Sequence, residues 1–384
     1  MIPPGSWLGL LGGGQLGRMF AMAAQSLGYR VMVLDPGTDS PAGSVADAHI
    51  QADYLDEAGL GRLAEGCLAI TTEFENVPAA SLAALASRRP VRPGADSVAV
   101  AQDRIREKVF LSGIGIAVAP YAVIRSAGDI KATDPALFPG ILKRSWLGYD
   151  GKGQARVSTP DKALRIFREW AEEPCVLEQA LAIGREVSII VCRGGDGATV
   201  TYPVVENSHI GGILDITIAP ARITPELHRR AIDWSLRIAD ELGYCGVLCV
   251  EFFVLEEGTL LVNEIAPRPH NSGHYTLDAC VTSQFEQQAR ILADLPLGNC
   301  GLHCPAVMVN LLGDLWAAGE PRWEKVLRHS RAKLHLYGKR EARPGRKMGH
   351  FTVLGEDSQT ALELAQSIQQ ELVADSLAGR ANQS

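Results

Sequence analysis

Strands alternate with helices over the first hundred residues, and this alternation limits the fold more than any other feature. An apolar strand is expected at Trp7–Leu11, a helical pattern covers Gln15–Leu27, and a second strand is expected at Arg30–Leu34. Another strand is expected at Cys67–Thr72, after an intervening helix. Strands that alternate with helices form parallel sheets with helices on both faces. We therefore predict an α/β unit at the N-terminus.

Two further regions follow this unit. A strand and turn at Pro90–Gly94 are expected to close it, and one charged helix is expected over Ser97–Leu111. From Ile114 to Val205 short strands surround one helix near Lys162–Trp170, which predicts a small α+β domain. The strands expected there are Phe138–Lys143, Gln154–Ser158, Cys175–Gln179, Glu186–Cys192 and Thr199–Val205.

Longer β segments and helices return from Glu206 onward. Thr224 is a plausible cap for a helix that runs to Leu242, because Pro225 occupies its first position. The elements expected after it are strands at Ala306–Leu311, Lys333–Tyr337 and Gly349–Leu354, a helix at Thr360–Val373 and a frayed tail at Ser376–Ser384.

The composition is that of an ordinary globular chain. Its 384 residues, 46% hydrophobic and 21% charged, suffice for two or three domains. The net charge of −7 gives no reason to expect a nucleic-acid partner. No run approaches the roughly 18–20 apolar residues of a membrane span, and no signal-peptide pattern is seen, so we expect a cytoplasmic protein. The eight cysteines lack zinc-ribbon spacing and are expected to be reduced core thiols.

The segment Glu251–Glu264 reads as two short apolar strands joined by a turn. A turn centred on Glu257 and Gly258 pairs Glu251 with Glu264, with their Cβ atoms about 5 Å apart. Facing carboxylates are destabilising unless a positive charge lies between them. Mg²⁺ takes carboxylate oxygens and commonly bridges to nucleotide phosphates. The pair therefore predicts a Mg²⁺ site, and the alternative is a solvated acidic hairpin end.

The loop Gly12–Gly17 satisfies G-x-G-x-x-G, follows a strand and opens a helix. Asp35 ends the second strand, where dinucleotide-binding proteins place an acid on a ribose hydroxyl. A nicotinamide or flavin enzyme is therefore one interpretation. Glycines and a helix N-terminus bind any phosphate, however, and close helix–strand packing is a purely structural alternative. We predict a phosphate site and leave its ligand open.

A second glycine loop lies within Lys143–Gln154, between two expected strands. It is not a Walker loop, which would need G-x-x-x-x-G-K-[ST] opening a helix. It suits a flap over phosphates, since consecutive backbone N–H groups can form an anion nest. Lys143 would place an ammonium group beside those phosphates. The alternatives are a flexible hairpin tip and, for the nearby Glu178 and Glu186, ordinary surface acids.

Several segments together carry a family resemblance: Gly12–Met19, Thr72–Val77, Gly148–Gln154, Asn263–His274, Tyr337–Lys339 and Arg343–His350. In these segments the chain resembles the ATP-grasp enzymes and, among them, the 5-(carboxyamino)imidazole ribonucleotide synthases of purine biosynthesis. The resemblance extends over residues 12–350, and Asn263–His274 is its most specific part. Ala180 and Leu181 vary from the family pattern, in the linker that would bind adenine.

The resemblance implies an ATP-grasp fold, of α/β and α+β type. A Rossmann-like N-terminal domain would cover 1–112, a small ATP-grasp lobe 113–205, and a larger C-terminal lobe with a terminal β/α subdomain 206–384. The implied activity is the carboxylation of 5-aminoimidazole ribonucleotide with bicarbonate and MgATP through carboxyphosphate. A homodimer is also implied.

The resemblance also implies roles for individual residues. ATP would be bound by Arg104, Lys108, Lys143, Gly148, Tyr149, Asp150, Gly151, Lys152, Gly153, Gln154, Glu178, Gln179, Ala180, Leu181, Glu186, His209, Asn263 and Glu264. Mg²⁺ would be held by Glu251 and Glu264. The ribonucleotide and bicarbonate would be bound by Gly14, Gln15, Leu16, Glu73, Lys339 and Arg346. The reacting groups would be lined by Tyr149, Asp150, Arg268, His270 and Asn271, with Asp150 handling a proton.

Some of these assignments have open alternatives. Glu75 is an alternative to Glu73 beside the substrate, a lone histidine such as His209 is more often structural, and Arg268 and His270 can be loop-packing residues. Rival functions are another ATP-grasp carboxylase or ligase, a nicotinamide-dependent dehydrogenase and a nucleotide sensor without turnover.

Overall fold

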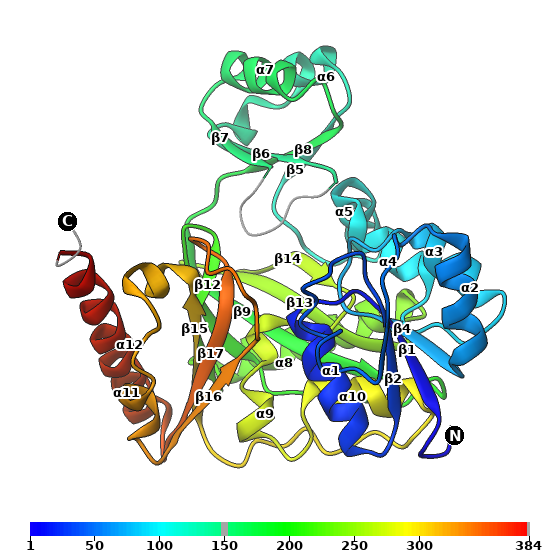
Figure 1. Ribbon diagram of the computed structural model, residues 1–384. Coiled ribbons are helices and arrows are strands. Elements are labelled where there is room, and N and C mark those ends of the chain that lie inside the picture. The colour runs from blue at the N-terminus through cyan, green and yellow to red at the C-terminus, as the bar shows by residue number, and fades with distance from the viewer. Residues whose placement is uncertain (147–152, 382–384) are drawn as a thin grey trace.

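The computed structural model describes residues 1–146 and 153–381, and they form three sheets (Figure 1). The N-terminal sheet is parallel, in the strand order β3-β2-β1-β4, as predicted. Its elements are β1 (Trp7–Leu11), α1 (Gln15–Ser26), β2 (Arg30–Leu34), β3 (Ala48–Ile50), α2 (Glu57–Gly66), β4 (Ala69–Thr72) and α3 (Ala79–Ala86). The expected strand at Pro90–Gly94 is wrong, because only one isolated bridge, Ile70 to Val91, forms there.

The single helix predicted over Ser97–Leu111 is two helices, α4 (Ala95–Gln102) and α5 (Arg104–Gly113). Asp103 separates them because its backbone is extended and its carboxylate accepts the Ile105 amide at 2.9 Å. An aspartate that caps a helix in this way begins a new one. The break lets α5 take its own direction, toward the edge of the large sheet.

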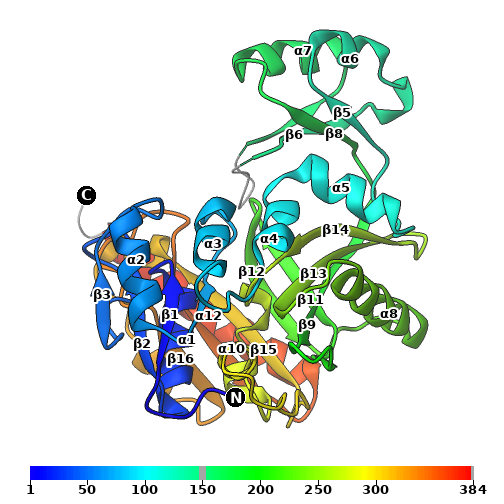
Figure 2. The ribbon, with the colours of Figure 1, turned by 90° about the vertical axis from the view of Figure 1, so that its right-hand side faces the viewer.

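The small sheet is antiparallel, in the order β5-β8-β6-β7. Its elements are β5 (Tyr121–Ile124), α6 (Ala127–Ala132), the 3-10 turn η1 (Pro135–Leu137), β6 (Gly140–Arg144), β7 (Gln154–Val157), α7 (Pro160–Glu169) and β8 (Cys175–Gln179). The prediction missed β5 and α6. Figures 1 and 2 show this sheet, with α6 and α7 on its outer side, standing apart from the rest of the molecule.

The large sheet follows the order β14-β13-β9-β11-β12-β15-β17-β16, with β10 paired to β9. Its strands are β9 (Ile183–Arg193), β10 (Thr199–Thr201), β11 (Val205–Ile210), β12 (Ile213–Ala219), β13 (Gly246–Leu255), β14 (Leu260–Ala266), β15 (Ala306–Leu312), β16 (Ala332–Leu336) and β17 (Lys347–Leu354). The predicted small lobe, 113–205, is therefore too long. Its last strands, β9 and β10, belong to the large sheet because β9 pairs with β13 along its length.

Helices cover the large sheet on both faces. They are α8 (Pro225–Glu241), α9 (Thr276–Ala279), α10 (Gln284–Leu292), α11 (Glu324–Leu327) and α12 (Ser358–Ala381), with 3-10 turns η2 (Asn271–Gly273) and η3 (Gly313–Ala318). Thr224 caps α8, as predicted. The predicted frayed tail from Ser376 is wrong as far as Ala381, since α12 continues to that residue.

Two apolar cores cover most of the large sheet and limit where polar side chains can lie on it. Val250, Phe252 and Val262 face α8 in one core. On the opposite face, apolar residues such as Cys249 and Ala266 form a second core with α9 and α10. Because side chains alternate along a strand, Glu251 points away from the α8 core. The end of this face beyond the second core is left for polar residues.

The N-terminal unit shares its core with the large lobe. Phe285, Ala289 and Leu292 of α10 pack with Leu8 and Phe20 in one apolar cluster. This packing fixes the first glycine loop relative to the large sheet. Within the described residues, none of the helices combines the length and hydropathy that a bilayer crossing requires.

Candidate active site

Glu251 and Glu264 are paired across β13 and β14, as predicted, but a β-bulge produces the pairing. From the turn onward Val254 pairs with Leu260 and Phe252 with Val262, and the register then shifts between Phe252 and Glu251. A bulge sets two residues of one strand against one residue of its partner. Asn263 and Glu264 therefore both oppose Glu251, so Asn263 need not face away from the site.

Each of the two carboxylates has a charged partner. Glu251 Oε1 lies 2.9 Å from His270 Nε2, and Glu264 Oε2 lies 3.0 Å from Arg104 Nη1. Burial alone would raise the pKa of Glu251, but His270 holds it at about 2. Burial alone would lower the pKa of His270, but Cys249 and Glu251 raise it to about 10. At neutral pH both members of the Glu251–His270 pair are therefore charged.

The residues at the bulge fit a hard divalent cation. Two carboxylates and the amide oxygen of Asn263 are the oxygen ligands that Mg²⁺ takes. Glu251 pairs through Oε1 and Glu264 through Oε2, so a cation bound between the two carboxylates would use the second oxygen of each. Glu251 is ionised at neutral pH, as a ligand must be.

Buried cations extend from this pair toward the small sheet. Lys143 Nζ lies 2.7 Å from Glu178 Oε2, and Lys108 Nζ lies 3.4 Å from Glu178 Oε1. Lys108 also donates to the Asn263 carbonyl at 2.9 Å. Burial lowers the pKa of Lys143, while burial would raise the pKa of Glu178 and the two lysines lower it. The Glu178 side chain is thus a counter-ion that joins β8 to both lysines.

The predicted adenine linker, Glu178–Leu181, begins in the last residues of β8 and leads toward β9. The amide of Ala180 donates to the Pro139 carbonyl at 2.9 Å, so this N–H is already used. Glu186 and His209 lie on the neighbouring strands β9 and β11, with Oε2 of Glu186 2.6 Å from Nδ1 of His209. Burial lowers the pKa of His209, but its contact with Glu186 raises it above the usual value.

The second glycine loop is bracketed as predicted, because Lys143 of β6 pairs with Gln154 of β7. Gly153 has φ of +69°, a conformation that favours glycine. The site residues Gly148, Tyr149, Asp150, Gly151 and Lys152 lie outside the described residues.

The loop after β14 holds Arg268, His270 and Asn271. Arg268 forms a two-pronged ion pair with Glu75, through its Nε and, at 3.1 Å, its Nη2. Burial alone would raise the pKa of Glu75, but Arg268 holds it at about 2. Asn271 exchanges amide hydrogen bonds with Asn310 at 3.0 and 3.1 Å. Both polar atoms of the Asn271 side chain are thus engaged by Asn310, which supports a structural role for this residue, although the sequence predicted that it lines the reacting groups.

The first glycine loop is held by two carboxylates of the chain itself. Glu73 accepts the amides of Gly14 and, at 2.6 Å, of Gly17, and Asp35 accepts the Gly13 amide at 2.8 Å. Glu73 thereby caps α1, which has no side-chain cap of its own. Burial raises the pKa of Glu73 to about 7, although both backbone hydrogen bonds lower it.

These contacts bear on two predictions. The amide of Gly14 is already bonded to Glu73, so a phosphate at this loop would rely on the amides of Gln15 and Leu16. Asp35 accepts hydrogen bonds from Gly13, Gly37 and Tyr54, the last at 2.7 Å. An acid engaged in this way is poorly placed to bind a nicotinamide ribose, which disfavours the dehydrogenase interpretation.

Lys339 reaches the first glycine loop from the far end of the sequence. Its Nζ donates to Gln15 Oε1 at 2.5 Å and to the Lys347 carbonyl at 2.6 Å. It also lies close enough to Glu73 to lower the pKa of that carboxyl. Gln15, Glu73 and Lys339 are thus brought together as predicted. Arg346 donates to the Glu341 carbonyl at 2.8 Å, within its own loop.

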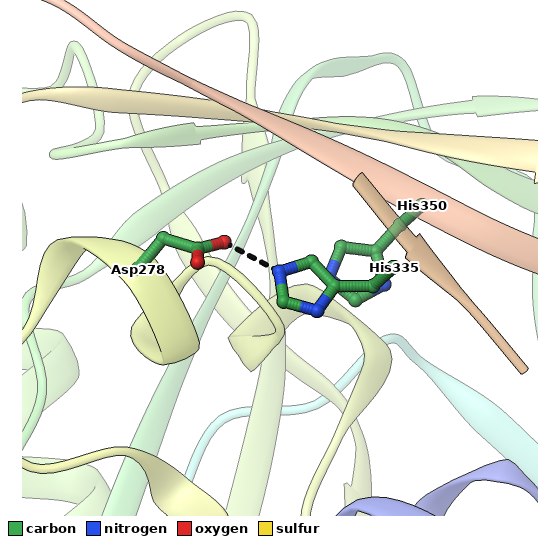
Figure 3. Close-up of side chains that lie close together, drawn as sticks. All are labelled: Asp278, His335 and His350. Atoms are coloured by element: carbon green, nitrogen blue, oxygen red, sulfur yellow. Dashed lines mark hydrogen bonds and ion pairs between the residues drawn. The ribbon is translucent and has the colours of Figure 1, made fainter. Parts of the chain in front are cut away.

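Asp278, His335 and His350 form a second group with metal-ligating side chains, shown in Figure 3. His335 Nε2 lies 2.8 Å from Asp278 Oδ2, and the two imidazole rings stack at 4.5 Å with planes 12° apart. The lone pair of a ring nitrogen lies in the ring plane, so two stacked rings do not direct their lone pairs at one ion. His350 also bonds Tyr337 through Nδ1 at 2.9 Å. We therefore assign this group to hydrogen bonding.

The sequence interpretation missed Glu107, which is buried between Arg104 and Lys108 on α5. It accepts the Ile265 amide at 2.6 Å. Burial raises its pKa to about 7, although Lys108 lowers it. The signal was available, because residues spaced by three and four positions share one face of a helix.

Comparison with known proteins places these features in one family. Residues 6–102 match the ribonucleotide synthetase preATP-grasp domain, residues 109–285 the ATP-grasp domain, and residues 306–364 the phosphoribosylaminoimidazole carboxylase C-terminal domain. The N5-carboxyaminoimidazole ribonucleotide synthase of Bacillus subtilis is 42% identical, over 92% of this chain and 93% of the relative.

Solved structures agree. An ADP complex of an N5-carboxyaminoimidazole ribonucleotide synthetase has a TM-score of 0.91 at 41% identity, over 96% of this chain and 97% of that one. The Aspergillus clavatus enzyme, in complex with ADP and 5-aminoimidazole ribonucleotide, has a TM-score of 0.87 at 30% identity, over 97% and 99% of the two chains. With matches to these three domain families and a relative this similar along nearly its whole length, the chain belongs to the N5-carboxyaminoimidazole ribonucleotide synthase family of ATP-grasp ligases.

Proposed function

We propose that the chain carboxylates 5-aminoimidazole ribonucleotide with bicarbonate, using ATP as phosphoryl donor, and releases the N-carboxy product, ADP and phosphate. The observation that carries this function is the bulge, which sets Asn263 and Glu264 against Glu251 beside three buried cations, Arg104, Lys108 and Lys143. A site with paired carboxylates and clustered cations suits a metal-bound polyphosphate.

Glu251 and Glu264 would hold Mg²⁺. When bound, the metal ion would neutralise charge that develops on the transferred phosphoryl group. The residues of this chain would supply the rest of the electrostatics. Lys143 and Lys108 carry positive charge near the lobe junction, with Glu178 as their shared counter-ion. Glu186 and His209 would bind the nucleoside.

The chemistry would proceed in two steps. A bicarbonate oxygen attacks the γ-phosphorus, and the bond from that phosphorus to the oxygen bridging to the β-phosphate breaks. The products of this step are ADP and carboxyphosphate. The amine nitrogen of the ribonucleotide then bonds to the carboxyl carbon, directly or after release of CO₂. Phosphate leaves and the nitrogen loses a proton, for which Asp150 is the proposed acceptor. The loop Gly148–Gln154 would exclude water that destroys the mixed anhydride.

The function is tested by a coupled assay of ADP formation. ADP should appear only when 5-aminoimidazole ribonucleotide and bicarbonate are both present. Equal ADP release with another amine acceptor would instead support a different ATP-grasp carboxylase. ATP binding without ADP formation in any mixture would support a sensor, and tight NADH binding would revive the dehydrogenase.

The Lys339–Gln15 contact leads to a prediction about the second substrate. Lys339→Ala should raise the KM for the ribonucleotide about 10–100-fold, because a charge-assisted contact contributes roughly 1.5–3 kcal/mol. The KM for ATP should change less than about threefold, since Lys339 contacts Gln15 of the first glycine loop, where the ribonucleotide phosphate would bind. Steady-state kinetics with each substrate varied in turn measures both values.

Arg340→Ala is the matched control for Lys339→Ala. Arg340 is the next residue, its side chain is 79% exposed, and it pairs with Asp39 on the surface. It should leave both KM values unchanged. If Lys339→Ala weakened ATP and ribonucleotide equally, the lysine would be a structural residue.

We also propose a homodimer in the cytoplasm, as the family resemblance implies. Light scattering on the purified protein measures its mass in solution, and a mass of one chain would contradict the dimer. Fractionation of cells that contain the protein tests the compartment.

A further inference from the structure

The β-bulge in β14 decides which side chain faces Glu251. If the register of the Val254–Leu260 and Phe252–Val262 pairs continued without the bulge, Asn263 would oppose Glu251 and Glu264 would oppose Val250. A shift of one residue turns a side chain to the other face of a sheet. Glu264 would then point into the apolar core between the sheet and α8, where Val250 is buried. The extra residue is therefore what brings the second carboxylate to the site.

The outer edge of β14 is bound by α5 at the bulge. β14 is the edge strand of the large sheet, and Figure 2 shows α5 lying along it. Three consecutive residues of the strand are each held by a different residue of α5. The contacts run from Lys108 Nζ to the Asn263 carbonyl at 2.9 Å, from Arg104 Nη1 to Glu264 Oε2 at 3.0 Å, and from the Ile265 amide to Glu107 Oε1 at 2.6 Å.

Glu107 differs from the other two members of this clamp. It is an acidic residue that accepts a backbone N–H of the strand, whereas Lys108 donates to a backbone carbonyl, and the residue is only 2% exposed. Arg104 pairs with the Glu264 carboxylate itself, and Lys108 also pairs with Glu178. Arg104 therefore contacts a proposed metal ligand directly, and Lys108 contacts the backbone carbonyl of Asn263. Glu107 reaches the site through its hydrogen bond to the strand, and its charge also acts on Lys108, Glu264 and Arg104.

We propose that Glu107 is a positioning residue of the metal site, because its carboxylate fixes the Ile265 amide and so holds the bulge that turns Glu264 toward Glu251. This inference rests on the proposed function, in which Glu251 and Glu264 bind the cation. Its chemical requirement is a hydrogen-bond acceptor at position 107. Loss of a residue that orients a metal ligand typically weakens metal binding about 10–100-fold.

The test compares Glu107→Gln with Glu107→Met. The amide oxygen of glutamine can still accept the Ile265 N–H, whereas methionine has a similar shape and no comparable acceptor. Electron paramagnetic resonance measures Mn²⁺ affinity in the presence of saturating ADP. Hydrogen exchange of the peptide that contains Ile265 is measured without metal. Glu107→Met should weaken Mn²⁺ binding at least about tenfold and speed exchange at Ile265, and Glu107→Gln should stay within about threefold of the wild type.

Two further variants make the outcome specific. Leu111→Ala removes a buried core side chain from the same helix and leaves the three polar contacts to β14 in place, so it lowers the melting temperature while its Mn²⁺ affinity should be unchanged. Mn²⁺ affinity that is normal in Glu107→Met, or equally weak in Glu107→Gln or Leu111→Ala, would overturn this inference alone. Wild-type affinity in Glu264→Gln would overturn the proposed metal site as well.

Discussion

Glu264→Gln should lower the rate of ADP formation on the order of 10³-fold at saturating ATP, bicarbonate and ribonucleotide. A neutral amide replaces one of two carboxylates that face each other at the bulge. The lost stabilisation of the transition state is about 4 kcal/mol if the metal neutralises charge on the phosphoryl group. The Arg104 guanidinium also loses its anionic partner, at 3.0 Å, and would add positive charge where the cation binds.

The matched control for this variant is Glu206→Gln. Glu206 lies in the same sheet and is paired with Arg185 and Arg222, away from the facing carboxylates. Turnover of the control should remain within about twofold of the wild type. The rate is measured with the coupled ADP assay over a range of Mg²⁺ concentrations. Near-normal turnover of Glu264→Gln at low Mg²⁺ would remove Glu264 as a ligand.

The sequence predicted the pairing of the two carboxylates but not its cause. Alternation and turn chemistry are local, so they predicted two strands and a turn near Glu257 and Gly258, which the structure confirms. The residues at the bulge are contacted by α5, which lies more than a hundred residues earlier in the chain. Contacts of that separation leave no periodic trace in the sequence. The prediction assumed a turn centred on Glu257 and Gly258 and no bulge. These two errors in register cancel, so the predicted pair of Glu251 and Glu264 was right.

The lobe boundary failed for a related reason. Residues 183–201 have the alternation of strands, and nothing local distinguishes a strand of the small sheet from one of the large sheet. β9 joins the large sheet because it pairs with both β13 and β11, which come later in the chain. The two-helix break at Asp103 was locally readable, since aspartate before a helical run is a common cap.

Among the site residues, those in contiguous motifs were easiest to predict. The Gly12–Gly17 loop and Glu73 come from separate segments, and the resemblance, not the spacing, joined them. The resemblance placed both beside the substrate, but in the structure they also bind each other, because Glu73 caps α1 through the amides of Gly14 and Gly17. Glu73 follows β4, whereas α1 follows β1, and no rule that reads the sequence locally predicts that a carboxylate after one strand caps the helix after another.

Arg268→Met should lower the free energy of unfolding by about 3 kcal/mol, because it leaves the Glu75 carboxylate, whose side chain is only 22% exposed, without its partner. The pair joins the segment after β4 to the loop after β14, so it fastens the N-terminal unit to the large lobe. The double variant Arg268→Met with Glu75→Gln should recover part of the loss, since removing both charges removes the uncompensated burial. Urea unfolding at neutral pH measures all three proteins.

The pH dependence of the Glu75–Arg268 pair has a definite sign. The pKa of Glu75 is depressed from 4.5 to about 2, so its contribution is fully present above pH 4.5 and is lost as the pH falls toward 2. The shift corresponds to about 3 kcal/mol, which Glu75→Gln should remove from the acid dependence of unfolding. Arg331→Met, which breaks an exposed pair with Glu356, should change stability by less than about 1 kcal/mol. An equally small change in Arg268→Met would mean that Glu75 is solvated or protonated at neutral pH, and the pair would not fasten the two units together.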